Sequence, residues 1–202
     1  ETYPAPLGVF VETGTPYNED TTEDTAIRPA EINAAVWSTI IKGARNIYYF
    51  TLGDAASWNN GGIINGVFWQ TPITGESVSN YAQVKATNAL VKTLATIINS
   101  PFALGYVTVS PAAQRLTAAQ ADAGFDVMAK YHNVAGGNNK FYIFAIPRTN
   151  DTNQSATFTI KNTGASQVTV INESRTISIT NGGTQFVDTF ADGNTVHIYR
   201  VD

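Results

Sequence analysis

The stretch that decides the fold reads Gly8-Val-Phe-Val-Glu-Thr13, then Arg28-Pro-Ala-Glu-Ile-Asn-Ala-Ala-Val-Trp-Ser-Thr-Ile-Ile-Lys-Gly-Ala-Arg45, then Asn46-Ile-Tyr-Tyr-Phe50. Its first and last parts are short apolar runs, which are typical of strands covered on both faces. The longer middle part has the pattern of a helix. The stretch therefore predicts a strand, a loop, a helix and a second strand, with Glu12 at the C-terminal end of the first strand.

The helix prediction depends on its two ends and on its apolar stripe. Pro29 suits the first helical position, where its missing N–H has no consequence. Gly43 suits the position just after the helix. Between them, apolar residues recur at helical spacing, at Ile32, Val36, Trp37, Ile40 and Ile41. A helix between two apolar strands predicts a βαβ unit in a parallel sheet, where ligands bind at the C-terminal strand ends.

The chain changes character near Pro101. Before it, Ser79 and Asn80 are good N-caps for a second helix, predicted from Tyr81 to Ile98. After it, short alternating segments joined by Gly- and Asn-rich turns predict an antiparallel β-sandwich. The predicted strands are Tyr106–Ser110, Phe125–His132, Lys140–Pro147, Ala156–Lys161, Gln167–Asn172, Thr176–Thr180, Thr184–Thr189 and Val196–Val201.

The composition excludes several classes of function. The 202 residues carry a net charge of −4, and no Lys/Arg cluster indicates a nucleic-acid partner. Without cysteine there is neither a disulfide nor a thiolate metal site. No apolar run reaches the roughly 20 residues of a membrane span, and no signal peptide is visible. Only 14% of the residues are charged, which is common in extracellular proteins, so we expect a secreted protein.

Four motifs carry a resemblance to a known group of enzymes. They are Pro6-Leu-Gly-Val-Phe-Val-Glu12, Arg28-Pro-Ala-Glu-Ile32, Ala35-Val-Trp37 and Ile41-Lys-Gly-Ala-Arg-Asn-Ile-Tyr-Tyr-Phe50. In this order they resemble the last part of a retaining glycoside hydrolase with a (β/α)₈ barrel, in which the nucleophile Glu ends the seventh strand. The resemblance implies a fold of α/β plus all-β class: the last two βα units of a TIM-type barrel, incomplete in this chain, followed by a β-sandwich.

The resemblance also implies what the chain lacks. It gives residues 1–102 as the βαβα portion of the barrel and residues 103–202 as the sandwich domain. A retaining glycosidase needs a second carboxylate as acid/base, and in those enzymes that residue sits on the fourth strand. Two βα units cannot close a barrel, so we expect an N-terminal chain or segment to complete it. Without it the chain is expected to be inactive.

The candidate site residues follow from this reading. Glu12 is the expected nucleophile, although a strand-end Glu can also cap a helix or pair with Arg28 or Arg45. Expected carbohydrate contacts are Tyr17, in the loop after the first strand, and Asp54, Trp58 and Trp69, after the second. Trp rings stack on the apolar faces of sugars, but the alternative for Trp58 and Trp69 is a buried ring that packs a loop.

No cofactor and no metal site is expected. His132 and His197 are the only histidines, both in predicted strands and without a second ligand at metal spacing, so we interpret them as structural. The predicted function is the C-terminal portion of a secreted hydrolase that acts on a polysaccharide or oligosaccharide. The alternative is a non-catalytic carbohydrate-binding or structural and assembly module.

Overall fold

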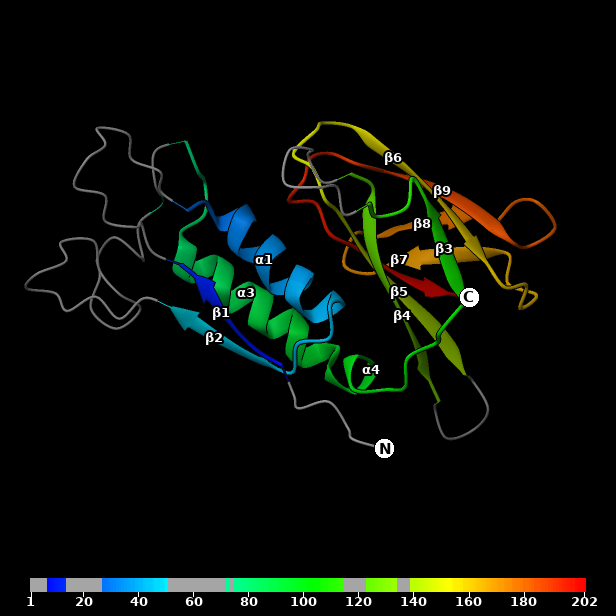
Figure 1. Cartoon of the computed structure of the whole chain (residues 1–202), viewed down its shortest axis with the longest axis horizontal. Coiled ribbons are helices and arrows are strands. Elements are labelled where there is room, and N and C mark those ends of the chain that lie inside the picture. Colours follow the sequence, from blue (N-terminus) through cyan, green and yellow to red (C-terminus); the bar gives the residue numbers. More distant parts are fainter. Residues whose placement is uncertain (1–6, 14–26, 51–71, 73–74, 115–122, 134–138) are drawn as a thin grey trace, which may run out of the picture. The chain divides into compact units, whose positions relative to one another are not determined.

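The computed structural model describes residues 7–13, 27–50, 72, 75–114, 123–133 and 139–202, and the chain divides into two compact units, Glu1–Lys92 and Thr93–Asp202 (Figure 1). Each unit is described by itself. Strands outnumber helices in the described residues, and most of the strands form antiparallel sheets. None of the helices described is long and apolar enough to span a membrane.

The first unit contains a parallel pair of strands. β1 (Gly8–Glu12) and β2 (Asn46–Phe50) pair in parallel register, with Gly8 opposite Asn46 and Glu12 opposite Phe50. Figure 1 shows both arrows pointing the same way, with helices beside them. The predicted strand–helix–strand order and its parallel pairing are therefore confirmed. Parallel strands need a crossover connection, and the helix between them lies on that connection.

Helix α1 (Pro29–Ile41) begins and ends as the sequence predicts. Pro29 is its first residue, and Glu31 Oε2 accepts a hydrogen bond from the backbone N of Arg28, the N-cap, at 2.7 Å. This bond satisfies one of the N–H groups that a helix start leaves without a partner. Trp37 and the other residues of the apolar stripe are buried, so this face of the helix packs into the unit.

The end of α1 is a Schellman motif. Gly43 has φ +94°, its N donates to Ile40 O at 2.9 Å, and Ala44 N donates to Thr39 O at 2.9 Å. The two bonds satisfy carbonyls that would otherwise have no intrahelical partner, and the positive φ is the reason for glycine at this position.

The second predicted helix is two helices. α3 (Asn80–Thr93) ends one residue before Leu94, whose φ −93° and ψ 6° leave helical geometry, and α4 (Ala95–Ile98) follows. The prediction of one continuous helix was wrong at this point, because an isolated change of backbone angle at a leucine leaves no mark on the apolar pattern. Ser79 is the side chain that caps α3, since its Oγ accepts a hydrogen bond from Ala82 N at 3.2 Å.

The second unit is a β-sandwich. One sheet has the order β4-β5-β10-β7-β8 and the other β3-β6-β9, and all their pairings are antiparallel. The strands are β3 (Val107–Ser110), β4 (Phe125–His132), β5 (Lys140–Pro147), β6 (Gln154–Ile160), β7 (Gln167–Val170), β8 (Arg175–Ser178), β9 (Gln185–Phe190) and β10 (His197–Val201). Each predicted strand has its counterpart, so the predicted sandwich is confirmed.

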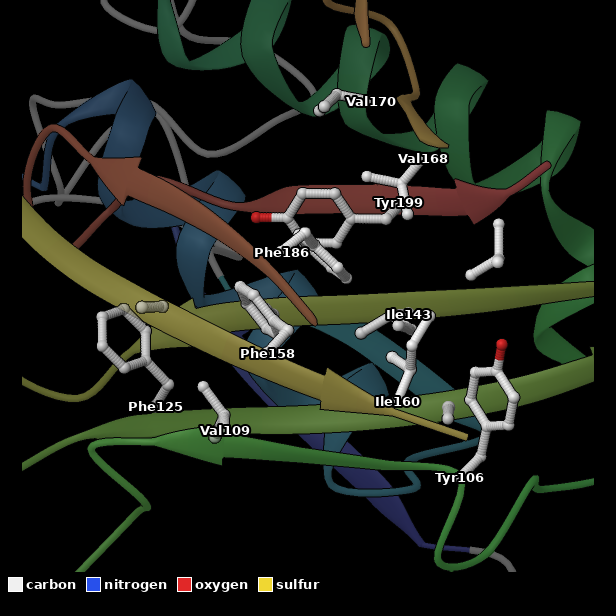
Figure 2. Close-up of a cluster of buried hydrophobic side chains, with 14 of the residues drawn as sticks. Tyr106, Val109, Phe125, Ile143, Phe158, Ile160, Val168, Val170, Phe186 and Tyr199 are labelled. Carbon is white, nitrogen blue, oxygen red and sulfur yellow. The ribbon is translucent and has the colours of Figure 1, made fainter. Parts of the chain in front are cut away.

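Alternate residues from both sheets meet in one aromatic core. Phe158 on β6 and Phe186 on β9 stack with ring centroids 4.7 Å apart, and Tyr199 on β10 lies 5.2 Å from Phe158 (Figure 2). All three rings are buried. Strands β6 and β9 contribute every second residue to this core, as their alternating burial shows.

Candidate active site

Glu12 lies at the C-terminal end of β1, on the face of the strand pair that the helices described leave uncovered. Alternate residues of a strand share a face, so Glu12 lies on the same face as Phe10, which is 71% exposed, whereas Val11 on the other face is 2% exposed. Tyr48, opposite Phe10 in the register, is 51% exposed, and the two rings lie 5.2 Å apart. The strand pair therefore presents two aromatic rings and one carboxylate together.

The opposite face of the strand pair is tied to the helices. α1 packs against β1, and Tyr49 on β2 donates its hydroxyl to Asn88 Oδ1 on α3 at 2.7 Å. Burial of the Tyr49 ring raises the pKa of its hydroxyl, which stays a neutral donor. This arrangement gives the two faces of the pair different roles: one is packed, and the other carries Glu12.

The carboxylate of Glu12 is partly buried, and its Oε1 accepts a hydrogen bond from the backbone N of Thr13 at 3.1 Å. The sequence left open an ion pair of Glu12 with Arg28 or Arg45. Of these two arginines, Arg28 lies with its Nη1 3.8 Å from Glu76 Oε1.

The four predicted carbohydrate contacts, Tyr17, Asp54, Trp58 and Trp69, lie outside the described residues. They stay predictions. The predicted distance to a second carboxylate stays a prediction as well.

A second polar cluster, which the sequence did not predict, lies in the sandwich. Asp188 on β9 is 9% exposed and binds the guanidinium of Arg175 on β8 through two bonds, at 2.9 and 2.7 Å. Asp188 also accepts the hydroxyl of Tyr199 at 2.9 Å. Since β8 and β9 belong to different sheets, this ion pair joins them.

The electrostatics of the cluster favour its charged form. Burial alone would raise the pKa of the Asp188 carboxyl, but the bonds from Arg175, the Thr189 backbone and Tyr199, with the charge of His197, together lower it. Burial raises the pKa of Tyr199 well above its ordinary value. His197 is buried, and its Nδ1 lies 2.5 Å from a carboxylate oxygen of Glu173. Each carboxylate here already has a partner, which is the pattern of a structural network.

The sequence holds a signal for this cluster. Asp188 is in phase with Phe186 and Phe190, the inward residues of β9, and His197 is in phase with Tyr199 on β10. A charged residue on the core phase of a strand needs a buried partner. The exposed phase of β9 carries Val187 instead, which is 50% exposed.

An open hollow of about 400 Å³ lies beside the β7–β8 turn of the sandwich, lined by side chains that include Thr169, Asn172, Ser174 and Arg175. These are hydroxyl, amide and guanidinium groups, which can bond to sugar hydroxyls. None of the residues that line this hollow is aromatic.

Comparison with known proteins gives structural likenesses only. No protein-family model and no curated protein matches the chain. Among solved structures, a Thermotoga maritima α-fucosidase in complex with fucose is similar at 8% identity and a TM-score of 0.46, over 96% of this chain and 39% of that one. A second structure of Thermotoga maritima α-fucosidase gives 7% identity and a TM-score of 0.42, over 96% of this chain and 39% of that one.

Another structure, described as an α-L-fucosidase, gives 11% identity and a TM-score of 0.37, over 100% of this chain and 40% of that one. The chain thus spans about two fifths of the length of these structures. At such identities and TM-scores, the likeness assigns neither a family nor an activity to this chain.

Proposed function

We propose that this chain forms the C-terminal portion of a retaining glycoside hydrolase, in which β1 and β2 are the seventh and eighth strands of a (β/α)₈ barrel and Glu12 is the nucleophile. The proposal rests chiefly on one observation. Glu12 stands at the C-terminal end of a parallel strand, on the face that the helices in the described residues leave uncovered. In (β/α)₈ barrels the helices cover the outside, and catalytic residues sit at the C-terminal strand ends, around the interior.

The uncovered face also supports the proposal that the barrel is completed by other strands. Phe10 and Tyr48 are large and exposed on it, and a barrel interior is filled with such side chains in layers. An N-terminal chain or segment would cover these rings and supply the acid/base carboxylate. We propose that both rings lie in the barrel interior, beneath the catalytic end of the strands.

In the proposed reaction, a carboxylate oxygen of Glu12 attacks the anomeric carbon, and the glycosidic bond to the leaving sugar breaks. The acid/base on the completing strands protonates the glycosidic oxygen as it leaves. Water then hydrolyses the glycosyl ester with help from the same acid/base, and the configuration is retained. The substrate is a polysaccharide or oligosaccharide. Its proposed contacts are Tyr17, Asp54, Trp58 and Trp69, and the protein is proposed to be secreted.

The test is covalent labelling of the natural assembly, isolated from its source under native conditions. A panel of 2-deoxy-2-fluoroglycosyl fluorides traps the glycosyl ester of a retaining enzyme, and peptide mass mapping locates it. We expect an adduct on Glu12. Glu12→Ala should lose activity by several orders of magnitude and recover part of it with azide, whereas the control Glu31→Gln, at the start of α1, should retain activity. An adduct on a different carboxylate, or a product of inverted configuration, would refute the proposal.

A carbohydrate-binding module is the second candidate function, and the hollow beside the β7–β8 turn favours it. Its hydroxyl, amide and guanidinium groups are suited to sugar hydroxyls. A glycan array and NMR titration of the sandwich residues test this function. Shifts confined to Asn172, Ser174 and Thr176, without hydrolysis, would support it, and unchanged spectra with every glycan would exclude it.

A further inference from the structure

Asn80, the first residue of α3, bonds two parts of the first unit that are far apart in sequence. Its Nδ2 donates to the backbone O of Thr13 at 3.3 Å and to the backbone O of Ile27 at 3.0 Å. Thr13 directly follows Glu12, and Ile27 directly precedes Arg28, the N-cap of α1. One side-chain amide therefore bonds both the residue that follows β1 and the residue that precedes the N-cap of α1.

The chemistry of an asparagine suits this role. A primary amide has two N–H donors in a fixed plane, so it can satisfy two carbonyls at once. Thr13 is fully buried and lies one residue beyond the last pair of the β1–β2 register, so its carbonyl needs such a partner. Serine has a single hydroxyl donor, and an ionised aspartate has none.

The helix cap and the bridge are made by different side chains. Ser79 caps α3 through Ala82 N, so Asn80 is released from the capping role that its sequence position suggests. Its Oδ1 is buried and has no hydrogen-bond partner in the part of the chain that the structure describes. An unsatisfied buried polar atom is costly, so the two bonds that the Asn80 amide donates must offset that cost.

We propose that Asn80 is the positioning residue for Glu12. By holding the carbonyl of Thr13, it restrains the residue whose own N–H, one peptide earlier in the chain, bonds Glu12 Oε1 at 3.1 Å, and so it orients the carboxylate. The catalytic meaning of this orientation rests on the proposed function, but the orientation itself can be measured without it.

The chain offers a matched control on the same helix. Asn80 acts as a donor, whereas Asn88 acts as an acceptor, from the hydroxyl of Tyr49 at 2.7 Å. Asn→Asp keeps the shape, removes the donors and keeps the acceptors. Asn80→Asp should therefore break the bridge, and Asn88→Asp should preserve its bond. A negative charge near the start of α3 also favours the helix dipole, so a loss in Asn80→Asp cannot come from the helix itself.

The experiment is amide hydrogen exchange of the whole chain by NMR, read at Thr13 and Arg28, the two N–H groups bonded to Glu12 and Glu31. Asn80→Asp should speed exchange at both N–H groups by about tenfold at pH 6, which corresponds to about 1.4 kcal/mol. The effect should be smaller near pH 3, because the carboxyl of the substituted side chain is then protonated and has one O–H donor. The Glu12 Cδ resonance should shift as well. Asn80→Ala, which removes the donors without adding charge, should make exchange at Thr13 and Arg28 faster than in the wild type at both pH values.

Unchanged exchange at Thr13 and an unchanged Glu12 Cδ resonance in both Asn80 variants would overturn the proposal, as would an equal effect of Asn88→Asp. The catalytic consequence is measured separately in the natural assembly, where Asn80→Asp should lower kcat more than it changes KM. If the NMR effects appear but the wild-type assembly has no glycosidase activity, the proposed function fails while the positioning of Glu12 by Asn80 stands.

Discussion

Replacing Asp188 by Asn should destabilise the sandwich and remove part of its dependence on acid. The carboxylate is 9% exposed and accepts two bonds from Arg175, one from Tyr199 and one from the Thr189 backbone. Removing one partner of a buried ion pair typically costs about 3–5 kcal/mol. Because the side chain of Arg175 is 35% exposed, solvent screens the pair, and we expect a loss of about 2–3 kcal/mol.

The pH dependence has a definite sign. The pKa of Asp188 is lower in the folded than in the unfolded protein, so its ionised form contributes stability above the unfolded pKa of about 3.9. That contribution is lost as the pH falls through the folded pKa. The wild type should therefore lose stability steeply below about pH 4, and Asp188→Asn should lose less over the same range because the titrating group is gone.

The assay is denaturant unfolding at pH 7 and at pH 3, followed by NMR signals of the sandwich core. All three tryptophans precede Lys92, so their fluorescence reports the first unit and serves as an internal control. Asp151→Asn, at an exposed carboxylate, is the matched substitution and should change stability by less than about 0.5 kcal/mol. The reasoning is refuted if Asp188→Asn also changes stability by less than about 0.5 kcal/mol, or if its acid dependence equals that of the wild type.

Three further outcomes can be measured. Gly43→Ala should cost about 1 kcal/mol in tryptophan-monitored unfolding, because φ is +94° while a Cβ there meets nothing within 4 Å; no loss would contradict the Schellman assignment. Phe158→Ala should cost about 3–5 kcal/mol in sandwich unfolding, since the ring is buried and stacked on Phe186; a cost below 1 kcal/mol would show a core that collapses around the cavity. Lys130→Met should speed chymotrypsin cleavage after Phe102, because Lys130 Nζ lies 3.4 Å from the centroid of that ring and binds the carbonyl of Ser100 at 3.0 Å; equal cleavage rates would show that Lys130 does not hold this segment in place.

Much of the fold could be predicted from local patterns. The bounds of β4, Phe125–His132, and β5, Lys140–Pro147, agree with the predicted ones at both ends, because turn residues flank both segments. Strands that end in a less marked turn, such as β7, which stops at Val170, differ by two residues from the prediction. The turn after β7 uses Asn172 and Ser174 at φ +67° and +51°, and alternation alone does not show where pairing stops.

The polar side chains could be predicted less well, since their roles depend on partners far away in the sequence. Asn80 reads as a helix cap, because Ser and Asn are equally good caps, and its true partners precede it by more than fifty residues. Asp188 reads as an outward residue of a polar strand until its phase with Phe186 is considered. Glu12 could be located at a strand end from its neighbours, yet which face it occupies follows only from the packing of Val11.

The polar bonds of α3 bear on how the nascent chain folds. Its side chains form hydrogen bonds to all the other elements described in the first unit, or to residues next to them. Asn80 bonds to Thr13, just after β1, and to Ile27, just before the N-cap of α1. Thr87 bonds to Asn33 on α1 at 3.0 Å, and Asn88 bonds to Tyr49 on β2. Proteins emerge from the ribosome N-terminus first, so the two parallel strands leave the exit tunnel long before these anchors. Until α3 emerges, the apolar strands are exposed and open to pairing with other chains, and this is the interval in which a holdase chaperone would be needed most.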